Sequence, residues 1–338
     1  MDIENVNEIF DKFQGTNILV IGDVMIDCYI SGKVTRISPE APVPIINAES
    51  RSYRLGGAAN VALNLKSLGT NPILCSVIGS DNKAKVFYDL MEDADLDAVG
   101  IVPMFGRRTT IKYRIIGNNQ QIARVDDERD VQLKEREKRQ FITTMEQIIE
   151  HHPIDAIIFE DYDKGLFSKD LIMEIIHFAK KKGIFIAVDP KQRNFNYYSN
   201  VNLFKPNLKE LSRGLHIEDN VELSLEDIHD IAKRFAMEKS IDMVMITMSA
   251  KGIAFYDRNQ DQFYHHAAFP RHVSDVSGAG DTVISVATLF LLKENTMQMT
   301  CLAANIAGGL VCEYVGVVPV NKSHLRDEIL KHSSEEDI

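Results

Sequence analysis

The sequence of 338 residues lacks any long hydrophobic run. Its apolar stretches are short, and Val286 to Leu292 is typical, whereas a membrane-spanning helix needs roughly 18 or more apolar residues. The first ten residues, MDIENVNEIF, are acidic and polar, without the basic start and apolar stretch of a secretory signal. We therefore expect a cytoplasmic protein that does not bind membranes.

Cysteine is also scarce, and the chain has no C-x-x-C pair. The four cysteines lie among apolar neighbours, which favours reduced core residues over metal ligands or disulfides. The histidines show no metal-ligand spacing, and we expect the adjacent pairs His151-His152 and His265-His266 at the surface. The cysteines are Cys28, Cys75, Cys301 and Cys312.

Basic residues are outnumbered, with 38 Lys and Arg against 49 Asp and Glu, so the net charge is −11. Such a chain is a poor candidate for a nucleic-acid or anionic-membrane binder, although a local cluster of donors can still hold a small phosphate. No G-x-x-x-x-G-K-[ST] loop occurs, and no G-x-G-x-x-G follows the first expected strand. These absences argue against a P-loop NTPase and a Rossmann dehydrogenase.

What the sequence does contain is an alternation of strand-like and helix-like segments. This pattern predicts a mostly parallel α/β sheet with helices on both faces, and ligands bind such sheets at the carboxyl ends of the strands. Asp23, Asp161, Asp189, Lys205 and Thr247 fall near those ends. The expected strands are 17–23, 73–78, 155–159, 184–188 and 242–247, and the expected helices are 58–68, 168–182, 224–239 and 283–292.

Two segments break the alternation, at residues 31–53 and 109–125. The first holds three prolines among alternating apolar residues, and the second has a hairpin signal at Gly117-Asn118-Asn119. We interpret both as excursions that form a small accessory β-sheet, able to close over the site as a lid. The alternative is that both are ordinary surface hairpins.

The strongest chemical signal is Asp275-Val-Ser-Gly-Ala-Gly-Asp-Thr282, directly before an apolar helix. Gly278 and Gly280, on either side of Ala279, allow a tight turn whose backbone N–H groups form an anion hole at the helix start. Asp281 is expected to be ionised there and to accept a proton from an attacking hydroxyl. The alternative is a plain glycine turn with an Asp helix cap.

A second signal is Arg54-Leu-Gly-Gly-Ala-Ala-Asn60, which also precedes an expected helix. Gly56 and Gly57 allow close approach of a ligand, and Asn60 can donate to and accept from hydroxyls. Asp27, just past the first strand, suits a polyol. The alternative for the two glycines is a turn without a ligand.

Two further segments suit a nucleotide. Asn207 and Glu210 lie one helical turn apart and could order water around Mg²⁺ and phosphates, so that Glu210 would reach the metal only through water. Thr247, Ser249 and Gly252 form a strand-end turn able to contact phosphates or ribose.

With these motifs together, residues 10 to 330 resemble the ribokinase or PfkB-type sugar kinases. Within that family the chain looks similar to the D-glycero-β-D-manno-heptose 7-phosphate kinases of lipopolysaccharide-core synthesis, the kinase part of the ADP-heptose synthesis proteins. The residues that suggest this branch are Arg36 to Pro44, Arg54 to Ala62, Lys112-x-Arg114, Gln120 to Asp126, Asp161-Tyr-Asp-Lys-Gly165 and Asp189-Pro-Lys191.

The resemblance implies a ribokinase-like fold and phosphoryl transfer from Mg·ATP to the anomeric hydroxyl of heptose 7-phosphate, giving the 1,7-bisphosphate. Asp281 would be the base, the amides of residues 277–280 would stabilise the transferring group, and Asn305 would approach the adenine. Sugar hydroxyls would meet Asp27, Gly56, Gly57 and Asn60. The group expected around the sugar phosphate, whose basic members could instead be a solvated face, is Lys112, Arg114, Arg124, Asp189 and Lys191.

Some features depart from the family pattern. Ser277 stands where Thr is frequent, and Met248-Ser249-Ala250 replaces a turn that often carries Gly. No H-x-G-H motif occurs, so we expect residues 1–338 to be a single kinase domain without a fused nucleotidyltransferase. An open edge of the accessory sheet would favour a homodimer through the lids. The alternatives are a kinase of fructose 6-phosphate, tagatose 6-phosphate or ribose, and a catalytically silent sugar or nucleotide sensor.

Overall fold

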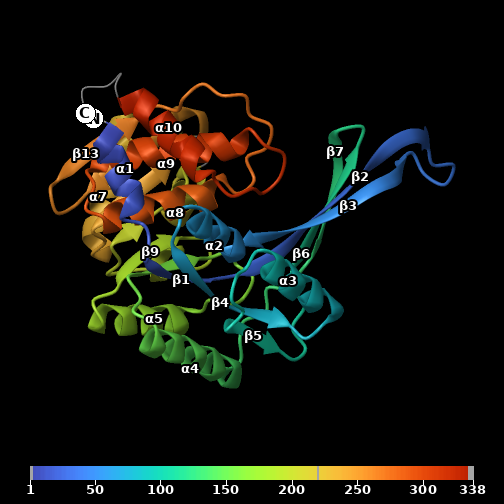
Figure 1. Ribbon diagram of the computed structural model, residues 1–338, viewed down its shortest axis with the longest axis horizontal. Coiled ribbons are helices and arrows are strands. Elements are labelled where there is room, and N and C mark those ends of the chain that lie inside the picture. The colour runs from blue at the N-terminus through green and yellow to red at the C-terminus, as the bar shows by residue number, and fades with distance from the viewer. Residues whose placement is uncertain (1–2, 219–220, 334–338) are drawn as a thin grey trace.

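The computed structural model describes residues 3–218 and 221–333, and its centre is a nine-stranded sheet in the order β13-β12-β11-β10-β9-β8-β1-β4-β5 (Figure 1). Neighbouring strands from β11 to β5 pair in parallel, while β12 and β13 add antiparallel strands at one edge. The strands are β1 (Asn17–Gly22), β4 (Asn71–Gly79), β5 (Gly100–Met104), β8 (Ala156–Glu160), β9 (Phe185–Asp189), β10 (Leu203–Phe204), β11 (Met243–Thr247), β12 (Ile253–Asp257) and β13 (Gln262–His266).

Helices cover both faces of this sheet (Figure 1). Side chains of β1 alternate between the two layers: Ile18 and Val20 pack on one face, and Leu19 and Ile21 on the other. One layer contains α1 (Ile3–Asp11), α2 (Ala58–Ser67), α3 (Asn82–Asp93), α8 (Ala279–Leu292), α9 (Met297–Cys312) and α10 (Lys322–Ser333), and the other contains α4 (Glu135–His151), α5 (Lys169–Lys181), α6 (Leu208–Gly214) and α7 (Leu225–Lys239).

The predicted α/β fold, mostly parallel with helices on both faces, is therefore confirmed. The helix starts are more varied than the sequence suggests. Ser224 caps α7 by accepting from the Asp227 amide at 3.1 Å, as its spacing predicts. Ser168 precedes α5, but its buried hydroxyl has no hydrogen-bond partner among the described residues, so its side chain does not cap the helix.

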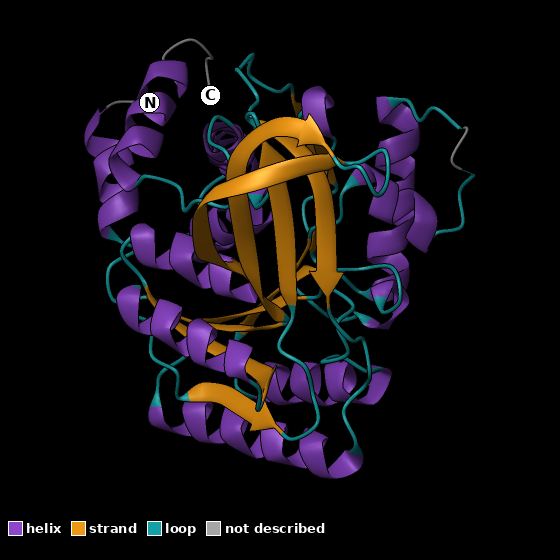
Figure 2. Ribbon diagram, turned by 90° about the vertical axis from the view of Figure 1, so that its right-hand side faces the viewer, coloured by secondary structure: helices purple, strands orange, loops and turns teal. Residues whose placement is uncertain are grey.

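A separate four-stranded sheet projects from the body in the order β3-β2-β6-β7 (Figures 1 and 2). It contains both segments that break the sequence pattern, which confirms the predicted accessory sheet. Asn118 and Asn119 both adopt positive φ in the β6–β7 turn, as a two-residue hairpin loop requires. The strands extend beyond the predicted segments, back to residue 24 and on to residues 57 and 127. They are β2 (Val24–Ile37), β3 (Pro44–Gly57), β6 (Ile111–Gly117) and β7 (Gln120–Asp127).

Three other expectations concern membranes, cysteine and histidine. No helix in the described ranges is long and apolar enough to cross a bilayer. All four cysteines are free, and three are buried, while Cys312 is only partly so. His266 is 5% exposed, so its predicted surface position is wrong: it ends β13 on the side covered by α9, where its ring lies 4.9 Å from that of Phe269.

Candidate active site

The Asp281 turn joins three parts of the chain. Gly278 precedes α8 with φ +83°, and a Cβ there would lie 2.8 Å from Asn60 Nδ2, so the turn needs glycine for both conformation and space. Asn60 donates to Asp281 Oδ2 at 2.7 Å, and the Tyr162 hydroxyl donates to Oδ1 at 2.8 Å. The base predicted from the sequence thus lies beside the predicted sugar-binding Asn60.

Asp281 is 3% exposed, and this burial raises the pKa of its carboxyl. The hydrogen bonds from Asn60 and Tyr162 lower the pKa, Asp189 raises it, and Lys205 lowers it. From the helix start alone, the sequence predicts an ionised carboxylate. Loss of water outweighs the favourable donors, so the net shift of the Asp281 pKa is upward from its usual value.

Two further carboxylates lie beside Asp281, each at the carboxyl end of a central strand. Glu160 ends β8 and Asp189 ends β9, directly opposite in the parallel register. One oxygen of each of the three carboxylates lies within 4.8 Å of the others. The buried Lys205 ammonium pairs with Asp189 Oδ2 at 2.7 Å, and a Cβ on Gly280 would lie 3.5 Å from the same oxygen.

Asp23 fixes the loop that carries Tyr162. Its buried carboxylate follows β1 and accepts three backbone N–H groups, from Tyr162, Lys164 and Leu166, at 3.0 to 3.2 Å. Three amides on one carboxylate pin the loop to the end of β1. The hydroxyl of Tyr162 is thereby held against the Asp281 carboxylate.

The predicted nucleotide pair Asn207 and Glu210 forms a reciprocal cap at the start of α6. The Asn207 side chain accepts from the Glu210 amide at 2.8 Å, and Glu210 Oε2 accepts from the Asn207 amide at 2.9 Å. Glu210 Oε1 accepts from Lys191 Nζ at 2.5 Å. Burial lowers the pKa of Lys191, but Asp189 and Glu210 more than offset this, so its net pKa is raised and it stays charged.

The other predicted nucleotide residues lie in two nearby places. Thr247 and Asn207 form an isolated parallel β-bridge through their backbones, which brings the end of β11 beside the start of α6. Ser249 and Gly252 belong to the next turn, both with positive φ, and a Cβ on Gly252 would lie 1.9 Å from the His266 carbonyl oxygen. Asn305 of α9 donates at 2.7 Å to the carbonyl of Ala267, the residue after His266.

From the accessory sheet, Asp27 and Arg114 form a buried ion pair. Lys112 is opposite Asp27 in the register of β2 and β6, and its ammonium lies 5.3 Å from the centre of the Tyr162 ring. Lys191 lies 5.0 Å from the centre of the same ring. Two of the predicted phosphate-binding cations therefore share one aromatic neighbour, whose hydroxyl contacts Asp281.

The other sheet residues divide between near and far positions. A Cβ on Gly56 would lie 2.3 Å from Asp27 Oδ2, and Gly57 is the N-cap residue of α2, with φ +62°. Arg124 is opposite Arg114 in the register, but 54% of its side chain is exposed and its Nε donates to Asp126 Oδ1 at 3.0 Å. It is the least enclosed of the predicted cations.

Sequence reasoning missed four residues that complete the arrangement. Tyr162 lay inside a motif used only for its family resemblance, and Asp23 and Lys205 were noted only for their positions at strand ends. Glu160 looked like the last residue of an apolar strand. A polar residue directly after each buried strand was the available signal. The four are Asp23, Glu160, Tyr162 and Lys205.

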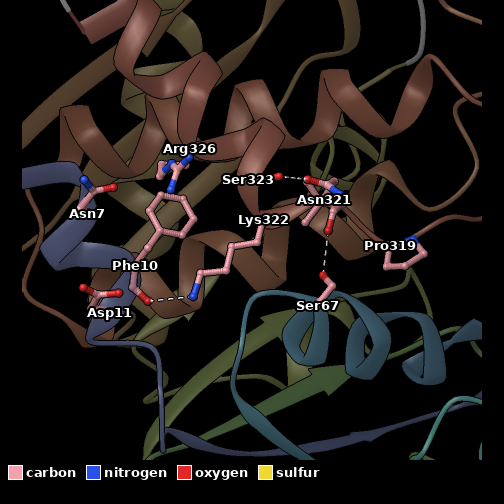
Figure 3. A pocket seen from close by; sticks show the side chains of 10 residues that line it. Asn7, Phe10, Asp11, Ser67, Pro319, Asn321, Lys322, Ser323 and Arg326 are labelled. Carbon is pink, nitrogen blue, oxygen red and sulfur yellow. Dashed lines mark hydrogen bonds between the residues drawn. The ribbon is translucent and has the colours of Figure 1, made fainter. Parts of the chain in front are cut away.

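A pocket of about 470 Å³ lies elsewhere, between α1, the end of α2 and the start of α10 (Figure 3). Ser67 and Lys322 line it, and their polar groups bond to backbone carbonyls of Val320 and Phe10. None of the residues predicted for catalysis or binding is among those that line it.

Comparison with known proteins places this geometry in context. The chain is 38% identical to Bifunctional protein HldE of Methylobacillus flagellatus over 317 residues, covering 94% of this chain and 64% of the relative. It is 39% identical to Bifunctional protein HldE of Helicobacter pylori strain G27, covering 88% of this chain and 63% of that relative. The chain therefore spans less than two thirds of the length of these curated relatives.

Solved structures share the fold at low sequence identity. Phosphofructokinase-2 from Escherichia coli in complex with substrates and products has a TM-score of 0.76 at 19% identity, covering 95% of this chain and 99% of that one. Arabidopsis thaliana ribokinase complexed with ribose and ATP has a TM-score of 0.69 at 15% identity, covering 94% and 98%. The fold is thus ribokinase-like.

The family model described as pfkB family carbohydrate kinase matches residues 15–323, which include every predicted site residue. That range spans both the nine-stranded body and the four-stranded sheet. With its buried Asp281 turn and its strand-end carboxylates, this chain belongs to the pfkB family of carbohydrate kinases, and is a sugar kinase.

Proposed function

We propose that this kinase transfers the γ-phosphoryl group of ATP to the anomeric hydroxyl of D-glycero-β-D-manno-heptose 7-phosphate, giving the 1,7-bisphosphate for ADP-heptose and lipopolysaccharide-core synthesis. The observation that carries the proposal is the joining of Asp281, through Tyr162, to Lys112 and Lys191. A base and two cations on one aromatic side chain suit a sugar with a hydroxyl at one end and a phosphate at the other. The identity of the sugar is inferred from the resemblance to heptose 7-phosphate kinases.

In the reaction, the Asp281 carboxylate accepts the proton of the sugar hydroxyl. The hydroxyl oxygen forms a bond to the γ-phosphorus, the bond from that phosphorus to the bridging oxygen breaks, and ADP leaves. The upward-shifted pKa of Asp281 makes it a stronger base once ionised. Tyr162 and Asn60 each bind one carboxylate oxygen, which leaves further lone pairs for the sugar proton.

The turn before Asp281 supplies the charge stabilisation. The Ser277 amide already donates to Asp275 Oδ1 at 3.0 Å and the Ala279 amide to the Val276 carbonyl at 3.3 Å. Of the amides of residues 277–280, those of Gly278 and Gly280 would therefore bind the oxygens of the transferring group, where the helix dipole favours negative charge. The transition state of phosphoryl transfer is loose, so positioning and charge are the main contributions of the protein. Lys205, buried beside Gly280, adds a fixed positive charge.

The sugar phosphate needs cations, and Lys112 and Lys191 are the two predicted ones whose ammonium groups lie near the Tyr162 ring. Lys191 also pairs with Glu210, and Arg114 pairs with Asp27. Sugar hydroxyls would meet Asp27, Gly57 and Asn60. A free-sugar kinase would have no use for the two lysines.

The nucleotide would lie along Asn207, Thr247, Gly252 and Asn305, with Mg²⁺ on its phosphates. Both oxygens of Glu210 already accept hydrogen bonds, so this residue fits a water-mediated contact to Mg²⁺ better than direct ligation. When bound, Mg²⁺ would offset the charge of the phosphates. The protein's own part is to hold the phosphates in line with the sugar hydroxyl.

We infer a homodimer through the accessory sheet. Its edge strand β7 carries the exposed apolar residues Ile122 and Val125, and pairing of sheets would cover them. The free cysteines suit the reducing cytoplasm.

The test is a substrate screen with Mg·ATP, in which ADP release is measured for heptose 7-phosphate, fructose 6-phosphate, tagatose 6-phosphate and ribose. Phosphorus NMR of the product identifies an anomeric phosphate. We expect the largest kcat/KM with heptose 7-phosphate. A larger kcat/KM with another sugar would reject heptose 7-phosphate as the substrate and assign that sugar instead. ATP binding without turnover on any sugar would favour the sensor interpretation.

A further inference from the structure

Glu160 is a member of the carboxylate cluster that has no role in the proposed reaction. Its side chain is fully buried at the end of β8. Within the described residues, neither of its carboxylate oxygens has a hydrogen-bond partner. A buried carboxyl group without a partner is unfavourable whether it is charged or neutral, so its environment is incomplete without a further group.

The neighbours of Glu160 show what the missing group is. Asp189 and Asp281 each bring a carboxylate oxygen, and all three oxygens lie within 4.8 Å of one another. A Mg²⁺ ion takes oxygen ligands at about 2.1 Å and Ca²⁺ at about 2.4 Å, so opposite ligands lie roughly 4 to 5 Å apart. The spacing therefore fits three ligands around one ion.

The charges in the cluster suit a divalent cation. Lys205 contacts one of the three carboxylates, with its ammonium 2.7 Å from Asp189 Oδ2. Lys191 is nearby, but its ammonium pairs with Glu210. When all three carboxylates are ionised, one lysine leaves two negative charges in this buried space, and one divalent cation balances them.

We propose that Glu160, Asp189 and Asp281 form a divalent-cation site that binds Mg²⁺ or Mn²⁺ directly, before any nucleotide arrives. Glu160 is the defining ligand, because its oxygens have no other partner. Asp281 keeps its bonds to Asn60 and Tyr162, since each carboxylate oxygen has a second lone pair. This site differs from a water-mediated ion near Glu210 in being made by the protein alone.

The inference deepens the site of the proposed function, but its test needs neither sugar nor nucleotide. The probe is Mn²⁺ alone, whose electron paramagnetic resonance signal separates free from bound ion. We expect one bound Mn²⁺ per wild-type chain, displaced by excess Mg²⁺. Glu160→Gln keeps the size of the side chain and removes its charge, and should weaken Mn²⁺ binding by at least about tenfold.

The control is Glu328→Gln, a partly buried glutamate on α10 that pairs with Arg271 away from the cluster. It should bind Mn²⁺ as the wild type does. Mn²⁺ should also raise the unfolding temperature of the wild type and of the control, but not of Glu160→Gln. If Glu160→Gln does not fold, Glu160→Asp keeps the charge, shortens the reach and should still weaken binding.

Failure to bind Mn²⁺ without nucleotide would overturn the site, as would equal binding by the wild type and the folded Glu160 variant. Either result would leave the proposed sugar phosphate reaction standing. Conversely, bound Mn²⁺ in a protein that does not turn over heptose 7-phosphate would retain the metal site and reject that substrate.

Discussion

The α/β body and the accessory sheet both bring side chains to the candidate active site, but they hold them by different contacts. In the body, Asp281, Asn60 and Tyr162 are joined by short hydrogen bonds among buried groups. In the sheet, Lys112 and Arg124 rely on an aromatic face and on charge pairs, and Arg124 is half exposed. Groups of the body are thus prearranged for chemistry, whereas those of the sheet suit a ligand that arrives with its own charge.

Asp281→Asn tests the body side most severely and has the largest expected effect. The amide keeps the shape of the carboxylate but accepts no proton, so kcat should fall by about 10³-fold. ATP binding, measured by titration calorimetry, should persist. Normal turnover in this variant would remove Asp281 from the mechanism.

Lys112→Met tests the sheet side at the cation that lies beside the Tyr162 ring. The substitution keeps the apolar stem and removes the charge, so KM for the sugar phosphate should rise roughly tenfold or more. The measurement is steady-state kinetics against the sugar, with kcat changed much less than KM. Lys191→Ala should act in the same direction, and an unchanged KM in both would indicate a sugar without a phosphate.

Tyr162→Phe tests the contact where the two sides meet. The hydroxyl lowers the pKa of Asp281, so its loss should raise that pKa further. The base works only when ionised, and the acid limb of the kcat–pH profile should therefore move to higher pH. A loss of kcat that is equal at every pH would assign Tyr162 a structural role alone.

Arg124→Ala has the smallest expected effect and provides the contrast to Lys112. Its guanidinium is half exposed and paired with Asp126, so the change in KM should be no more than about twofold. Steady-state kinetics on both variants under the same conditions gives the comparison. A KM effect as large as that of Lys112→Met would mean that the sheet encloses Arg124 when substrate binds.

The glycine turns that precede helices could be predicted from the sequence because their causes are local. Gly278 and Gly57 follow from turns that demand positive φ, and Asp281 and Asn60 follow from their places beside those turns. Alternating strands and helices likewise predicted the sheet and the strand ends where Asp189 and Thr247 lie. These features depend on residues close together in the sequence.

The pKa of Asp281 and the role of Glu160 could not be predicted in this way. Burial shifts the pKa of the Asp281 carboxyl group only once other elements of the fold cover it. The neighbours of Glu160 likewise depend on strands β8 and β9 lying side by side. The same holds for the ring of Tyr162, whose two lysine neighbours are Lys112 of β6 and Lys191 in the loop after β9. Such properties arise from contacts across long sequence separations.

The α/β pattern, the accessory strands and the glycine turns follow from the amino-acid order, because each is specified by short-range periodicity and by backbone conformations that only certain residues adopt. Which polar residues meet, and which lose their water, depends on how the folded chain packs. Desolvation and pairing depend on the groups packed around a residue, and this packing makes Glu160, at the end of an apolar strand, a member of a buried carboxylate cluster.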